Sequence, residues 1–135
     1  MLAICRFNRG NAIPIAERYF GEMDQTDYSP LIIGNSYVVY ALLFIFERID
    51  FLVRAPEQPP FWAPGSLFEL VDATIPSGWK FCVTQTHPNY RKLFNSFKIN
   101  YIMGYSLLIN EYQHYVGLVE REPREIQRFF EENLE

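Results

Sequence analysis

The feature that most constrains this chain is an unbroken run of ten apolar residues, Tyr37 to Phe46, which follows the turn-forming triplet Gly34-Asn35-Ser36. The run is dense in Val, Ile, Tyr and Phe, residues that suit the pleated, half-buried surface of a β-strand. A membrane-spanning helix needs about 20 residues, so the run is too short to cross a bilayer. An apolar strand on an exposed edge invites aggregation. We therefore expect this run to be the longest and most buried strand, with both its sides paired or covered.

Shorter apolar segments predict further strands in the first hundred residues. Ile49 to Arg54 is the expected hairpin partner of the long run, and the remaining predicted strands are Leu2 to Phe7, Leu67 to Val71 and Trp79 to Thr84. The segment Ala55 to Pro64 carries four prolines and predicts a loop. A short helix is expected within Asn11 to Phe20, and Trp62 and Trp79 are expected to be largely buried.

The pattern becomes helical near the C-terminus. Asn110 is a candidate N-cap, and Pro123 suits the first turn of a second helix. The apolar residues of these helices recur on one face: Tyr112, Tyr115, Val116 and Val119, then Ile126, Phe129, Phe130 and Leu134. The sequence thus predicts a single α+β domain over residues 1–135. Its architecture is a bent, partly barrel-like antiparallel sheet with helices at the C-terminal end.

Composition narrows the classes of function. The 135 residues are 49% hydrophobic and 17% aromatic, which is ample for one core and argues against disorder. The formal charge of −4 disfavours a nucleic-acid binder that relies on neutralising phosphates. Because no signal peptide or membrane segment is visible, we expect a cytoplasmic protein in which Cys5 and Cys82 are reduced, buried thiols.

Catalytic and metal-binding motifs are not apparent in the sequence. The spacing of Cys5, Cys82, His87 and His114 matches no zinc site, so we expect no metal and no cofactor. No nucleophile motif and no phosphate-binding glycine loop occurs. We therefore expect a protein that is not an enzyme. A small RNase-like enzyme that uses His87 or His114 stays open as a less favoured alternative.

Acidic residues gather in two places. Glu17, Glu22, Asp24 and Asp27 crowd one polar segment, and Asp50, Glu57 and Asp72 lie around the hairpin and the proline-rich segment. Each acid alone is best explained as solvated surface. Together they are candidate partner-binding residues, because a negative surface steers a basic partner and docks onto it.

Three motifs between Gly34 and Phe81 resemble a known group of proteins. They are G-N-S-Y-V-V-Y, then F-W-A-P-G-S-L-F-E-L-V-D, then I-P-S-G-W-K-F. This order is similar to that of small bacterial immunity proteins from toxin–immunity systems, including contact-dependent growth inhibition. The resemblance implies an intracellular protein that binds one cognate toxin domain, often a nuclease, and blocks its active site. The alternative is a non-catalytic structural or regulatory binding module.

Overall fold

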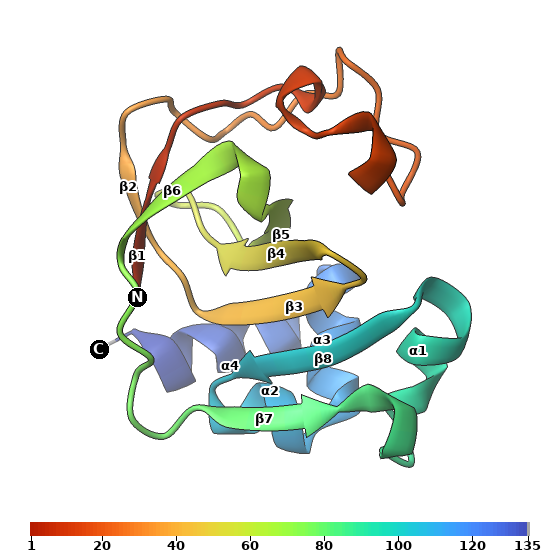
Figure 1. The fold of residues 1–135 in the computed structure, drawn as a ribbon. Coiled ribbons are helices and arrows are strands. Elements are labelled where there is room, and N and C mark those ends of the chain that lie inside the picture. Colours follow the sequence, from red (N-terminus) through yellow and green to blue (C-terminus); the bar gives the residue numbers. More distant parts are fainter. Residues whose placement is uncertain (135) are drawn as a thin grey trace.

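The computed structural model describes residues 1–134 and shows an α+β protein with two antiparallel sheets and helices that are mostly C-terminal (Figure 1). This confirms the predicted fold class. The strands divide between two sheets, and the part of the chain that the structure describes contains no closed barrel.

The smaller sheet has three strands in the order β2–β1–β6, and the larger has five in the order β5–β4–β3–β8–β7. The strands of the smaller sheet are β1 (Leu2–Cys5), β2 (Ser36–Val38) and β6 (Phe68–Asp72). Those of the larger sheet are β3 (Ala41–Ile45), β4 (Arg48–Val53), β5 (Phe61–Pro64), β7 (Lys80–Val83) and β8 (Ile99–Gly104). All the strand pairs are antiparallel.

The four α-helices follow β7 along the chain. They are α1 (Arg91–Phe97), α2 (Ser106–Asn110), α3 (Tyr112–Val119) and α4 (Pro123–Asn133). In Figure 1, α2, α3 and α4 lie behind the five-stranded sheet and cover one of its faces. Four short 3-10 turns complete the described elements: η1 (Gly10–Ala12), η2 (Ile15–Glu17), η3 (Gly65–Leu67) and η4 (Thr84–Thr86).

The long apolar run does not form one strand, so that prediction is wrong in length. It divides into β2 and β3, which belong to different sheets, and Val39 and Tyr40 connect them. The reason is that the run serves two cores: Tyr37 and Val39 are buried in one, and Leu43 and Ile45 in the other. The expected pairing is confirmed for β3, which is hydrogen-bonded to β4 on one side and β8 on the other.

Other boundaries differ from the sequence predictions in instructive ways. The proline-rich segment Ala55 to Pro64 ends in an edge strand, β5, where missing N–H donors are tolerated. The expected helix within Asn11 to Phe20 is replaced by η2 and part of η1. Asn110 ends α2, and the extended backbone of Glu111 separates α2 from α3. Pro123 opens α4 as expected.

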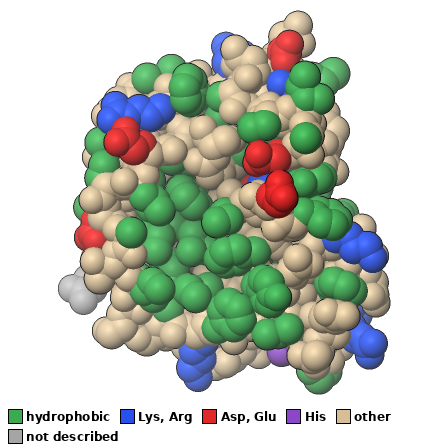
Figure 2. Space-filling model, viewed as in Figure 1, with side chains coloured by type: hydrophobic (Ala, Val, Ile, Leu, Met, Phe, Trp, Pro, Cys, Tyr) green, Lys and Arg blue, Asp and Glu red, His purple; other side chains and the backbone are tan. Residues whose placement is uncertain are grey.

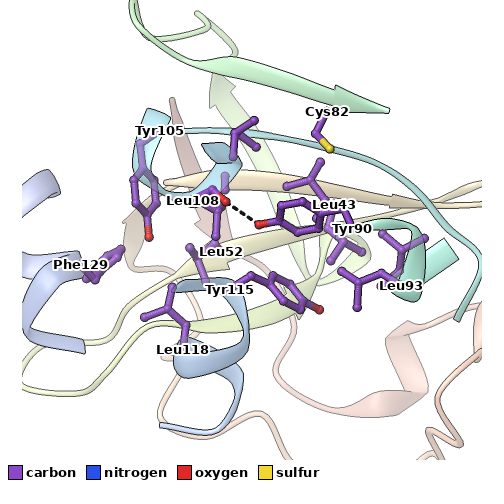
Figure 3. Close-up of a cluster of buried hydrophobic side chains, with 14 of the residues drawn as sticks. Leu43, Leu52, Cys82, Tyr90, Leu93, Tyr105, Leu108, Tyr115, Leu118 and Phe129 are labelled. Carbon is purple, nitrogen blue, oxygen red and sulfur yellow. Dashed lines mark hydrogen bonds between the residues drawn. The ribbon is translucent and has the colours of Figure 1, made fainter. Parts of the chain in front are cut away.

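Two hydrophobic cores stabilise the fold. The first lies between the five-stranded sheet and the helices, and Figure 3 shows its centre, where the Tyr90 hydroxyl donates a hydrogen bond to the carbonyl of Leu108. The second lies between the two sheets. Strand β4 serves both cores, since Leu52 packs in the first, and Phe51 and Val53 pack in the second. The two cysteines are free and buried, as predicted, one in each core.

Candidate functional site

The five-stranded sheet has one face that the helices do not cover, and its side chains are apolar. They come from four neighbouring strands: Phe44 on β3, Ile49 on β4, Phe81 and Val83 on β7, and Tyr101 on β8. We call these five residues the apolar face. Phe81 is 52% exposed, and Val83 and Tyr101 are each 40% exposed. Figure 2 shows this side of the molecule, where hydrophobic side chains gather over the sheet.

Strand register brings the members of the apolar face together. Phe44 lies opposite both Ile49 and Tyr101, and Tyr101 lies opposite Val83. The Tyr101 ring stacks on Phe81 at 5.4 Å between centroids and meets Phe44 edge-on at 6.2 Å. These contacts pack the three rings against one another on neighbouring strands. Contiguous apolar surface of this kind marks interaction sites in soluble proteins.

The local sequence explains why β3 is apolar on both sides. Its five residues, ALLFI, are all apolar, whereas a strand with one solvated face alternates apolar and polar residues. Leu43 and Ile45 face the helices. Leu42 and Phe44 point to the opposite face, where the three-stranded sheet covers the region around Leu42 and leaves Phe44 half-exposed.

The acidic residues predicted from the sequence do not form one surface. Asp24 and Asp27 are exposed but each has a basic neighbour, Arg18 at 2.8 Å and Arg9 at 3.7 Å respectively. A hydrogen bond from the backbone of Ser29 to its carboxylate lowers the pKa of Asp27.

The second group of predicted acids is also dispersed. Glu57 and Asp72 are exposed, and Asp72 accepts a hydrogen bond from the backbone of Thr74, which lowers its pKa. Glu17 is half-buried on η2. The exposed acids are therefore accessible to a partner, but they are distributed over different elements.

The prediction that Glu22 and Asp50 are partner-binding surface residues is wrong, because neither side chain is available at the surface. Their side chains are only 7% and 6% exposed, and both are bound to the buried guanidinium of Arg48. Arg48 donates from Nε to Asp50 at 2.7 Å and approaches Glu22 at 2.7 Å through Nη1. Nη1 also donates to the carbonyl of Glu17, and the Phe20 ring packs 5.1 Å from the guanidinium.

Burial sets the electrostatics of this cluster. It raises the pKa of Asp50, and the charge and hydrogen bonds of Arg48 oppose that rise. Burial and the nearby Glu22 carboxylate raise the pKa of Tyr28 to about 12. The cluster satisfies its own charges and joins the N-terminal segment to β4, so its geometry is that of a structural clamp.

The two histidines lie in different settings. His87 accepts hydrogen bonds at Nδ1 from the backbone N–H groups of Asn89 and Tyr90, each at 3.0 Å, and borders a cavity of about 440 Å³. Cys82 also lines this cavity, and burial raises the pKa of its thiol. A raised thiol pKa disfavours the reactive thiolate at neutral pH.

His114 is fully buried within a hydrogen-bonded chain. Its Nε2 lies 2.7 Å from the Tyr105 hydroxyl and its Nδ1 lies 2.9 Å from Glu125, which also binds Arg128 at 3.1 Å. A neutral ring protonated at Nδ1 satisfies both contacts, since Tyr105 then donates to Nε2 and Nδ1 donates to Glu125. These hydrogen bonds connect α3 and α4, and the His114 ring has no exposed surface that a substrate could reach.

Two residues with clear roles in the structure were not singled out from the sequence. Tyr101 lies in the sequence INYIMG, which mixes apolar and polar residues and does not by itself predict a strand. Arg48 lies two residues after the apolar run, between that run and its predicted hairpin partner Ile49 to Arg54. A signal for Arg48 existed in the alternation Arg48, Asp50, Leu52, which places both charges on the same strand face as a core residue.

The comparisons with known proteins add no relatives. The chain matches no family model, and no curated protein or solved structure is significantly similar to it. Within residues 1–134 no helix has the length and apolar character that a membrane span requires. The same residues bring together no group of three or more His, Cys, Asp or Glu side chains suited to a metal ion.

Proposed function

We propose that this chain is an immunity protein, which binds a cognate bacterial toxin domain and blocks its active site. The observation that carries the proposal is the apolar face, which presents three neighbouring aromatic rings on rigid strands. Buried aromatic anchors supply much of the binding energy in protein interfaces. A face of this kind suits a folded protein partner better than a small molecule, because it lies on an open sheet.

The charge of the chain supports a basic partner. The formal net charge is −4, and acidic side chains lie beside the apolar face in Figure 2. Charge of this sign attracts a basic domain and speeds its association. A toxin nuclease is such a domain, because it must bind phosphates. The resemblance of residues 34–81 to immunity proteins supports the same partner and a cytoplasmic location.

The test uses growth rescue together with direct binding. The chain is co-expressed with the candidate toxin domain encoded beside its gene, and the purified proteins are titrated by calorimetry. We expect the wild-type chain to restore growth and to form a one-to-one complex. The double variant Phe81→Ser/Tyr101→Ser should lose both, since each aromatic anchor contributes about 2 kcal/mol or more to binding.

A matched control separates the face from general hydrophobicity. Ile75 and Val119 are 55% and 54% exposed and lie outside the apolar face. The variant Ile75→Ser/Val119→Ser should bind and rescue as the wild type does. Equal rescue by both double variants would contradict the proposal. Binding without rescue would indicate a regulatory module, and a dimer that buries the apolar face, seen by light scattering, would indicate self-association.

A further inference from the structure

A cavity opens on the same side of the sheet as the apolar face. Its volume is about 390 Å³, within the range of small-ligand sites. Most of its walls are apolar side chains from β3, β4 and β6: Leu42, Ile49, Phe51, Phe68 and Leu70. Ile49 belongs to both the cavity and the apolar face, so the two surfaces are continuous.

The charged residues at this cavity are predominantly acidic. Glu17 from η2 and Glu47 from the β3–β4 turn line it, and neither carboxylate has an ion-pair partner within residues 1–134. Arg48 also lines it, but its guanidinium is already compensated by Glu22 and Asp50. Because Glu17 and Glu47 have no counter-charge among the described residues, the net charge of the cavity lining is negative.

We infer that this cavity receives an arginine side chain of the toxin domain. An arginine has an aliphatic stem that fits an apolar wall and a planar cation that pairs with carboxylates. Its guanidinium is more weakly hydrated than a lysine ammonium and stacks on aromatic rings, which favours it in a cavity walled in part by Phe51 and Phe68. The inference rests on the proposed function, because the arginine comes from that partner.

A model compound tests the chemistry without the partner. N-acetyl-arginine methylamide is titrated into the labelled protein and followed by amide chemical shifts in NMR spectra. The matched probe is the citrulline analogue, which has nearly the same shape and no charge. We expect the arginine probe to shift the amides of Leu42, Ile49 and Leu70 saturably. The citrulline probe should bind about tenfold more weakly, because hydrogen bonds to charged groups are the stronger ones.

Variants assign the effect to the two carboxylates. Glu17→Gln/Glu47→Gln should weaken the arginine probe to the level of the citrulline probe. The control Glu57→Gln/Asp72→Asn removes two exposed acids that do not line the cavity and should leave binding unchanged. Equal binding of the two probes, shifts outside the cavity, or an unaffected Glu17→Gln/Glu47→Gln variant would overturn the inference.

The outcome is distinguishable from failure of the proposed function. If Glu17→Gln/Glu47→Gln binds the toxin domain as tightly as the wild type while Phe81→Ser/Tyr101→Ser does not, the arginine inference fails and the immunity function stands. If neither variant changes toxin binding, both fail.

Discussion

Arg48 joins two parts of the chain, strand β4 and the N-terminal segment between β1 and β2. Its guanidinium contacts Asp50 on β4, the Glu22 carboxylate and the Glu17 carbonyl. The last two belong to the N-terminal segment between β1 and β2. One buried side chain thus positions a region without long secondary structure.

Removing this side chain should be costly. Arg48→Met leaves Glu22 and Asp50 buried without a counter-charge, and breaking a buried pair costs about 3–5 kcal/mol. The measurement is the free energy of unfolding in urea. Arg6→Met is the control, since Arg6 and Glu69 form an exposed pair worth about 0–1 kcal/mol. Similar losses in the two variants would contradict the clamp.

His114 should make stability depend on pH. Burial lowers the pKa of His114, and the hydrogen bond and charge of Glu125 only partly offset this. Below about pH 6.5 the unfolded chain therefore takes up a proton that the folded chain does not bind. The free energy of unfolding should fall as the pH drops from 7.5 to 5.5. Further acidification should add a second loss, because the pKa of Glu125 is also lowered in the folded state.

Two variants test this assignment by urea unfolding at both pH values. His114→Gln should lose most of the pH dependence, whereas His87→Gln is the control, because His87 takes no part in the buried hydrogen bonds of His114 with Tyr105 and Glu125. A steeper dependence in His114→Gln than in the wild type would show that another group titrates.

At the scale of the element, close contact between helices depends on Gly117. A Cβ at this position of α3 would lie 2.2 Å from Cγ and 2.6 Å from Cβ of Glu125 on α4. Gly→Ala inside a helix normally stabilises it by about 1 kcal/mol. Here we expect the opposite sign, with a loss of about 1–3 kcal/mol from overpacking. Urea unfolding of Gly117→Ala gives the sign directly, and a gain in stability would contradict the close packing of α3 on α4.

Some strands could be predicted from the sequence, and others could not. Strands β4, β6 and β7 were predictable because apolar segments of strand length lie between turn signals. Strand β8 was ambiguous, since INYIMG mixes apolar and polar residues and becomes a strand by pairing with β3 and β7. Burial of Asp50 has a signal in its alternation with Leu52, whereas burial of Glu22 was not predictable from its own position, because it depends on Arg48 reaching it in the folded structure.

At the scale of the whole molecule, the two cores should unfold together. Strands β3 and β4 contribute side chains to both, so neither core persists if these strands separate. Each core has its own fluorescent reporter. Trp62 is partly buried and packs against the first core, and Trp79, also partly buried, packs against the second.

Single-tryptophan variants test this cooperativity. Trp79→Phe reports on the first core through Trp62, and Trp62→Phe reports on the second through Trp79. Each fluorescence transition in urea should coincide with that variant's own circular dichroism transition, as expected for a single cooperative domain. Separated midpoints within either variant would show that the two cores unfold independently.

The two faces of strand β3 are under different constraints when the sequence diverges. Leu43 and Ile45 pack against the protein's own helices, whereas Phe44 lies on the uncovered side. Substitutions at Leu43 and Ile45 change the stability of the fold, whereas under the proposed function substitutions at Phe44 change the binding of the partner. Under the proposed function, variants of this chain that bind different toxin domains should therefore keep Leu43 and Ile45 apolar and vary at Phe44. In such a pattern, every second residue of the strand would vary with the bound partner, while the residues between them would stay apolar and keep the core intact.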